Sequence, residues 1–391
     1  MKYLSLLLLA FLVHQAPAQT TFDHHWKWNN NDSRLEVDLE GDILFARDYR
    51  SVESMSRDAL IRIERRERRR DRDLKIERKG GEIVYEYRRE GKRIPYDQAR
   101  EEIGDFLLSV VRDGGLDAER RVGILLEDGG VSAVMAEVRL VESGSGAGRY
   151  LSELVRQADL DTDELEEVAA LAASHVPSSG DRSRLLMLAA DDFQGSRATE
   201  SAWMKAASSI PSSGDRSRAL MRAIDAGMNI QATAGIISGI PSSGDKTRVI
   251  LHGLKSNPSP DAVAALVNAS QTISSSGDRT RALLAASPHI SESSAVRQAF
   301  VSSARSISSS GDKARLLLRV FQGDQLSQDV LIDALGVATT ISSSGDRARV
   351  LVAASRHVDG EAAERAYLDA AEGISGSSDR SRALRALISG S

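Results

Sequence analysis

The sequence contains no cysteine. Without thiols the chain can form no disulfide, no cysteine-ligated zinc site and no thiolate nucleophile. Aromatic residues are scarce at 4%, so there is no evident stacking surface for bases or sugars. The formal net charge is only −5, whereas general nucleic-acid binders are usually strongly basic. With 41% hydrophobic and 27% charged residues, the composition predicts a folded protein that does not bind nucleic acid.

The motifs of common catalytic sites are also missing. No His-Glu-x-x-His helix, Gly-x-Ser-x-Gly turn or glycine-rich phosphate loop with lysine occurs in the sequence. His24 and His25 are adjacent, but a closed metal site needs more ligands. We therefore expect no enzyme activity, no catalytic residue, no metal and no cofactor. The alternative, an enzyme, would need a cleft with a cluster of shifted pKa values between the two parts of the chain.

Long apolar runs are missing except at the start of the chain. Leu4–Val13 is mostly apolar, Lys2 precedes it, and Ala16-Pro17-Ala18 supplies small residues for cleavage. A run of about ten residues is too short to cross a bilayer of about 30 Å as a helix. We expect residues 1–18 to be a signal peptide and the mature protein to be periplasmic or secreted, without a membrane span. The lack of cysteine favours a bacterial source. A retained N-terminal anchor is the alternative.

A polar leader is predicted over residues 19–33, which include His24-His25-Trp26-Lys27-Trp28. Over residues 34–94, apolar and charged residues alternate with a period of two, which predicts a small antiparallel β domain with one buried face. The expected strands are Leu35–Leu39, Ile43–Phe45, Leu60–Ile63, Leu74–Ile76 and Ile83–Tyr87, with turns at Gly41-Asp42, Gly80-Gly81 and Glu90-Gly91.

Residues 95–141 change to a helical period and are predicted as a helical connector. A helix after Pro95 should end at Gly114-Gly115, and two further helices fit residues 117–127 and 130–142, divided by Gly129-Gly130.

From there on, a serine-rich step into Asp-basic-x-Arg, followed by aliphatic residues, recurs seven times. The copies begin at Asp181, Asp215, Asp245, Asp278, Asp312, Asp346 and Asp379. Self-similarity at about 33 to 34 residues indicates a repeat array, whose units bury their apolar faces only against their neighbours. We expect an all-α solenoid of helix pairs over residues 142–391, with residues 142–176 as a degenerate first copy. The fold class is thus α+β.

Each repeat shows the same internal logic. The serine or the aspartate should cap the first helix, and the fifth residue after the aspartate is always Leu or Ile, as in Leu283 and Leu317. A second helix should end at an aliphatic residue such as Ile307 or Ile341. The copy at Asp379 has only its first helix, which we expect to act as the cap of the array.

The candidate binding residues are the arginines three positions after each aspartate, called the Arg ladder below. They are Arg184, Arg218, Arg248, Arg281, Arg315, Arg349 and Arg382. Stacked repeats would place them roughly 10 Å apart, so they could grip an extended anionic partner. The structural alternative is that each pairs with its own aspartate or with helix-end carbonyls. A second basic segment, Arg62 to Lys79, could contact anionic lipid headgroups, but interleaved acidic residues favour the solvated face of a hairpin.

The layout resembles a loose family of bacterial envelope proteins that join an adhesin-like β region to helical repeats of the form Ile-Ser-Ser-Asp…Arg-x-Leu. Some members are attached to metallopeptidases of the β-lactam-sensing kind. The resembling segments are residues 36–45, 83–95, 121–126 and each Ile-Ser-Ser phrase, as at Ile341 to Arg349. The chain lacks the peptidase's zinc-binding motif, so the resemblance implies an envelope protein with a role in sensing or assembly and no catalytic residue.

These observations predict a non-catalytic extracytoplasmic scaffold that binds a protein or peptide through its solenoid surface. The alternative is a binding or sensing module for an anionic envelope component, such as an acidic polymer or a lipid headgroup, which would use the Arg ladder or the Arg62–Lys79 segment and touch the envelope peripherally.

Overall fold

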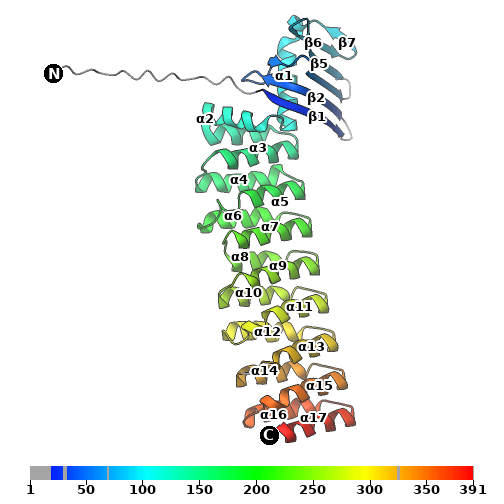
Figure 1. The fold of residues 1–391 in the computed structure, drawn as a ribbon, viewed down its shortest axis with the longest axis vertical. Coiled ribbons are helices and arrows are strands. Elements are labelled where there is room, and N and C mark those ends of the chain that lie inside the picture. The colour runs from blue at the N-terminus through cyan, green and yellow to red at the C-terminus, as the bar shows by residue number, and fades with distance from the viewer. Residues whose placement is uncertain (1–18, 30–32, 68–69, 324–325, 391) are drawn as a thin grey trace, which may run out of the picture. The chain divides into compact units, whose positions relative to one another are not determined.

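The computed structural model describes residues 19–29, 33–67, 70–323 and 326–390. The predicted signal peptide, residues 1–18, lies outside the described residues. The chain divides into two compact units, each with its own hydrophobic core. One unit holds the described residues up to Gly130 together with Val141–Gly146, and the other holds Val131–Leu140 and the residues from Ala147 onward. The predicted α+β class, an antiparallel sheet followed by a helical solenoid, is confirmed (Figure 1).

The sheet of the first unit is antiparallel, with β3 paired beside β2 and the other strands in the order β1-β2-β4-β5-β6-β7. The strands are β1 (Thr20–Asn29), β2 (Ser33–Phe45), β3 (Val52–Met55), β4 (Leu60–Glu67), β5 (Arg72–Lys79), β6 (Glu82–Arg89) and β7 (Lys92–Ile94). The predicted turns at Gly80-Gly81 and Glu90-Gly91 connect β5 to β6 and β6 to β7.

The prediction of a polar leader over residues 19–33 is wrong, because Thr20–Asn29 form strand β1 at the edge of the sheet. Its apolar side chains Phe22 and Trp26 lie on the same face of the strand: Phe22 is buried and Trp26 packs against the core. The polar residues beside them, such as Lys27 and His25, obscure this pattern in the sequence. Lys27 and His25 instead pair with Glu36 and Asp38 of β2.

The predicted turn at Gly41-Asp42 is also wrong, because β2 continues through it to Phe45. Gly41 has a φ of 81°, and a Cβ atom there would lie 2.8 Å from Cα of Ala59. The glycine therefore allows a close backbone approach inside a strand, which the sequence alone does not distinguish from a turn.

Helix α1 (Tyr96–Gly114) supplies the apolar layer against the sheet (Figure 1). It ends as predicted, with Gly115 as a left-handed cap at φ 58°. Phe106 and Leu107 of α1 share a core with Ile63 and Leu74 of the sheet. Helix α2 (Ala118–Leu140) is interrupted at Gly129 and Gly130, whose dihedral angles are not helical, which confirms the predicted division there.

The second unit is an array of helix pairs in which each helix packs on the second helix along the chain (Figure 1). After α3 (Gly144–Gln157), which begins within the first unit, two rows alternate. Row A holds the helices that follow each serine-rich step: α5 (Ser179–Leu188), α7 (Ser213–Asp225), α9 (Ser243–Lys255), α11 (Ser276–Ala286), α13 (Ser310–Val320), α15 (Ser344–Ala354) and α17 (Ser377–Gly390). Row B holds α4 (Thr162–His175), α6 (Arg197–Ser208), α8 (Ile230–Ile237), α10 (Pro260–Ser270), α12 (Ser294–Arg305), α14 (Gln328–Ala338) and α16 (Glu361–Glu372). The short 3₁₀ helices η1 (Ser287–His289) and η2 (Ser355–His357) follow α11 and α15.

Candidate functional site

The serine-rich steps hold neighbouring repeats together. In Ser274-Ser275-Ser276, the hydroxyl of Ser274 lies 3.0 Å from that of Ser243 in the preceding repeat. Ser275 is the N-cap of α11 and accepts the N–H of Asp278 at 3.2 Å. Ser276 reaches forward and lies 2.7 Å from the hydroxyl of Ser308. Each serine therefore has a different partner, and the serine, not the aspartate, is the cap.

The basic residue directly after each aspartate is a structural crosslink. Arg279, which is 9% exposed, donates from Nε to the carbonyl of Ile273 at 3.0 Å and from Nη1 to that of Ser306 at 2.5 Å. It thus joins the C-terminal ends of α10 and α12, whose last carbonyls lack partners within the helix. Arg182, Arg216, Lys246, Lys313, Arg347 and Arg380 also donate to carbonyls at the ends of row B helices. Burial lowers the pKa of Lys246 and Lys313.

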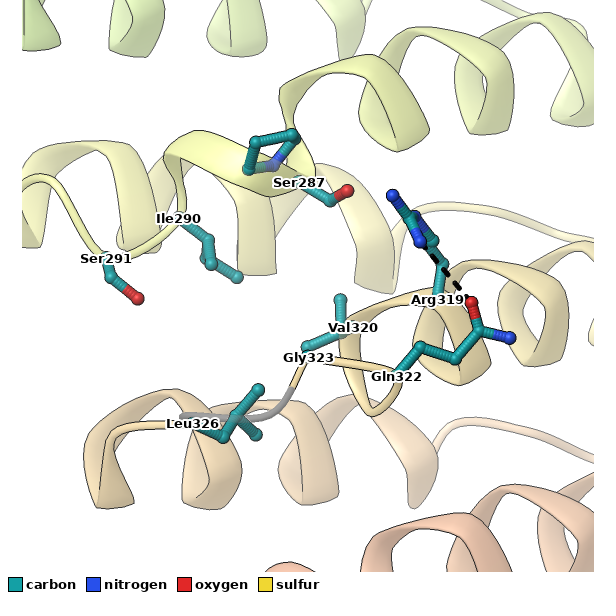
Figure 2. Close-up of a pocket in the computed structure, with 9 residues that line it drawn as sticks. Ser287, Ile290, Ser291, Arg319, Val320, Gln322, Gly323 and Leu326 are labelled. Carbon is teal, nitrogen blue, oxygen red and sulfur yellow. Dashed lines mark hydrogen bonds between the residues drawn. The ribbon is translucent and has the colours of Figure 1, made fainter.

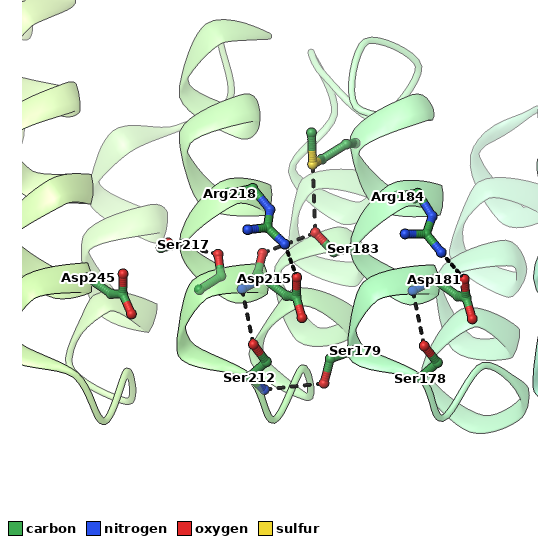
Figure 3. A network of polar contacts seen from close by, with 12 residues as sticks. Ser178, Ser179, Asp181, Ser183, Arg184, Ser212, Asp215, Ser217, Arg218 and Asp245 are labelled. Carbon is green, nitrogen blue, oxygen red and sulfur yellow. Dashed lines mark hydrogen bonds and ion pairs between the residues drawn. The ribbon is translucent and has the colours of Figure 1, made fainter.

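The Arg ladder has a different environment. Its side chains are between 53% exposed, for Arg382, and 75% exposed, for Arg184. They stand on the second turns of the row A helices, and each forms an ion pair with the aspartate three residues before it, in the first turn. In α11 the distance from Nη2 of Arg281 to Oδ1 of Asp278 is 3.0 Å. Figure 3 shows two successive members, Arg184 and Arg218, beside Asp181 and Asp215.

Every arginine of the Arg ladder therefore pairs with its own aspartate within the same helix, which is the structural alternative stated above. This pairing cancels much of the ladder's positive charge. Each pair nevertheless uses one terminal nitrogen of a guanidinium that has several donors. The ladder therefore presents alternating carboxylates and guanidinium groups to solvent, and exposed pairs of this kind hold their partners weakly.

Beside the Arg ladder runs a second feature that the sequence analysis missed. Three residues after six of the seven ladder arginines stands an aliphatic side chain that is half-buried, or exposed in the case of Val352. These side chains, called the aliphatic row below, are Met187, Met221, Leu251, Leu284, Leu318 and Val352. The exception is Arg382, which is followed at this spacing by Arg385. Positions three apart share one face of a helix, so the aliphatic row and the Arg ladder lie side by side. The spacing is readable from the aligned copies, but the exposure is not.

Two ion pairs connect a row A helix to the preceding repeat near the C-terminal ends of the row A helices; Asp191 lies in the turn after α5 and Asp225 is the last residue of α7. Arg222 of α7 lies 2.6 Å from Asp191, and His252 of α9 lies 2.7 Å from Asp225. Both pairs are partly exposed and lie beyond the aliphatic row on the same helices. On α7 and α9, these pairs therefore place charged groups on the other side of the aliphatic row from the Arg ladder.

The basic segment Arg62–Lys79 forms strands β4 and β5 and their connection. Arg66 pairs with Asp73 and Glu64, and Lys75 and Lys79 both pair with Glu77. The described part of this segment is therefore a hairpin whose charges are matched within each strand and, at Arg66 and Asp73, between the strands. Arg72 turns inward, with its guanidinium 4.6 Å from the centre of the Phe106 ring.

A small pocket of about 260 Å³ opens where η1 meets the end of α13 (Figure 2). Its lining includes Ser287, Ile290, Arg319 and Gln322, and Arg319 donates to the Gln322 side chain at 3.4 Å. The described lining residues offer hydrogen-bond donors, and among them there is no histidine or carboxylate that could act as a base toward a serine. Its chemistry suits the weak holding of a small polar group.

The histidines do not assemble in the described part of the chain. His25 contacts Asp38, and His289 and His357 contact Glu292 and the Phe321 carbonyl. Among the residues that the structure places, no three His, Asp or Glu side chains come together as metal ligands. Within the same residues, no helix is both long and apolar enough to cross a bilayer.

The chain matches no protein-family model, no curated protein and no solved structure. The resemblance to bacterial envelope proteins therefore stays a prediction, as do the signal peptide and the location outside the cytoplasm.

Proposed function

We propose that this protein is a non-catalytic scaffold of the bacterial periplasm or cell exterior, and that row A of its helical array binds an extended segment of another protein. The observation that supports this proposal is the repeated pairing of the aliphatic row with the Arg ladder. The exposed parts of these aliphatic side chains give a partner apolar area to bury. The aspartate–arginine pairs beside them offer the partner both negatively charged acceptors and positively charged donors.

The spacing of the helices favours an extended partner over a globular one. Packed helices are about 10 Å apart, and an extended chain rises about 3.1 to 3.4 Å per residue. Every third residue of such a chain would meet the next row A helix. A polyproline II segment has three residues per turn, so these residues would all point toward the array.

The second candidate is a module for an acidic polymer or lipid headgroup, bound through the Arg ladder. The ion pairs count against it, because each ladder arginine is already matched by its own aspartate. A polyanion would have to compete with these carboxylates along the whole array. Its affinity would fall steeply with added salt.

The test uses two peptides of identical composition. One carries an acidic residue at every third position with leucine beside it, and the other has the same residues at irregular spacing. Fluorescence anisotropy with the mature chain should show binding at least about fivefold tighter for the regular peptide. Equal affinities would contradict the proposal.

Variants identify the face that binds. Arg281→Ala with Arg315→Ala should weaken binding of the regular peptide about threefold, because two contacts of a few tenths of a kcal/mol each are lost. Arg305→Ala is the matched control, since it removes an exposed arginine from α12 in row B. Binding of polyglutamate or anionic vesicles that is strong at low salt and absent at high salt, with no preference between the peptides, would favour the second candidate.

A further inference from the structure

The last helix pair of the array leaves one of its faces uncovered by any described element. The fifth residue after the aspartate is nearly fully buried in the interior row A helices, with Leu283 at 0% and Leu317 at 1% exposure. Its equivalent in α17, Leu384, is half-buried. The residue two after the aspartate is buried in the interior repeats, as in Thr280 and Ala314, whereas Ser381 is exposed. Helix α17, which we expected to act as the cap of the array, therefore leaves part of its apolar surface exposed.

Helix α16 shows the same exposure in row B. Leu368 stands six residues before the terminal isoleucine of its repeat and is 41% exposed. The residues at this position in α10 and α14, Val267 and Leu335, are 1% and 0% exposed. The uncovered surface thus spans both helices of the pair. We call it the end face and define it by Glu364, Leu368, Glu372, Arg380, Ser381 and Leu384.

The end face also carries the groups that link one repeat to the next elsewhere. Arg279 uses Nη1 to reach the Ser306 carbonyl of the following helix pair. Arg380, its equivalent, donates from Nε and Nη2 to Ile374 within its own pair. Within the described residues, no further carbonyl accepts from it. Ser377 occupies the place of Ser276, which bonds forward to Ser308.

The two helices of the end face carry opposite charge. In α16, Glu364 and Glu372 lie at helical spacing with Leu368. This side of a row B helix faces the next repeat, because Arg297 of α12, at the position of Glu364, pairs with Asp329 and Asp333 of α14. Glu361, one turn before Glu364, is paired with Arg365 of the same helix. In α17, Asp379 is paired with Arg382, which leaves Arg380 and Arg385 as excess positive charge.

We propose that two copies of this chain form a two-fold dimer through the end face. A two-fold axis parallel to the helices places the partner's α17 on α16 and, by symmetry, the partner's α16 on α17. An axis across the helices would place acidic α16 on acidic α16. Charge therefore selects the first arrangement. Because α17 begins where α16 ends, it brings the partner's Arg380 to Glu372.

The size of the end face sets the strength of the dimer. Helix α16 has 12 residues, which makes it about 18 Å long, and two packed helices are about 20 Å wide. This patch is smaller than the roughly 800 Å² per partner of a standard interface. We expect a reversible dimer with a dissociation constant of about 10 to 100 µM.

Sedimentation velocity of the mature chain over that concentration range measures the dimer without any ligand, so its outcome is independent of the proposed function. Leu368→Glu should weaken dimerisation at least tenfold, because a buried carboxylate would replace a leucine. Val352→Glu is the matched control: Val352 is 39% exposed, close to Leu368, but it belongs to the aliphatic row. The control should dimerise like the wild type, and circular dichroism checks that both variants are folded.

A charge exchange tests the arrangement of the two helices. Glu372→Arg and Arg380→Glu should each remain monomeric alone, because like charges meet twice in each homodimer. An equimolar mixture of the two variants should dimerise, since both contacts of the heterodimer are again opposite in sign. A wild type that stays monomeric at about 100 µM, or a mixture that stays monomeric, would overturn the proposal.

Discussion

Two basic residues that stand two positions apart in each repeat have different roles. Arg279 lies against the ends of α10 and α12 and bonds to their carbonyls, whereas Arg281 stands in solvent beside Asp278. The difference arises from helix geometry, because positions two apart point about 200° apart around the helix axis. One therefore faces the neighbouring helices and the other faces water.

Arg279→Ala should destabilise the protein by about 2 to 4 kcal/mol, because it removes the hydrogen-bond donor of buried carbonyl groups at the helix ends. Arg281→Ala should cost at most about 0.5 kcal/mol, as is usual for exposed pairs. Urea unfolding followed by circular dichroism measures both variants. Equal losses of stability would show that the crosslink contributes nothing beyond the surface pair.

Asp113 is a buried carboxyl group in the first unit. It accepts the N–H of Glu142 at 2.9 Å, and Nη2 of Arg65 lies 3.7 Å from it. Burial raises the pKa of Asp113 above its ordinary value of 3.8. The folded state therefore binds the proton more tightly than the unfolded state, and this contribution to stability is present at low pH and lost as pH rises through the raised pKa.

Asp113→Asn removes this titration and should flatten the corresponding part of the pH dependence. The free energy of unfolding of the wild type relative to the variant should increase as pH falls through the raised pKa toward 3.8. Thermal unfolding at a series of pH values measures this difference. Glu101→Gln, at an exposed position of α1, serves as the control, and a difference with the opposite slope would contradict the assignment.

At the scale of the helix, leucines at the same position of the repeat are buried to different extents in different helix pairs. Leu335 of α14 is covered by the next repeat, whereas Leu368 of α16 is 41% exposed. Stability in a repeat array comes largely from the interfaces between neighbours.

Leu335→Ala should cost about 2 to 5 kcal/mol, as expected for a buried leucine in a packed core. Leu368→Ala should cost less than about 1 kcal/mol when it is measured at concentrations where the protein is monomeric. Chemical denaturation of the two variants, side by side, gives the comparison. A similar loss for both would mean that α16 is covered in solution even in the monomer.

At the scale of the whole molecule, the two hydrophobic cores are separate. The core of the first unit combines sheet residues with α1, while the core of the second runs from Leu165 to Ala383 through the array. A defect in one core removes no contact from the other.

Phe106→Ala should destabilise the first unit without destabilising the helical array. Phe106 is 1% exposed and lies beneath the guanidinium of Arg72, so the change leaves a cavity worth about 3 to 5 kcal/mol. Hydrogen exchange measured by mass spectrometry should show faster exchange in β2, β4, β5 and α1. Faster exchange throughout α9–α15 would show instead that the units unfold together.

Much of this fold follows from the sequence by itself. The recurring serine-rich steps, the Leu or Ile five residues after each aspartate and the glycines at 114–115 and 129–130 predict the array, its helix pairs and the limits of α1 and α2. These signals are local, since caps, turns and helical periods involve residues a few positions apart. Only the tertiary structure decided that Thr20–Asn29 join the sheet, that Gly41 lies within a strand, which arginine of each pair is buried, and that Leu368 and Leu384 are left partly exposed. Those outcomes depend on segments far away along the chain, because burial is a property of the packed neighbours and not of the residue itself.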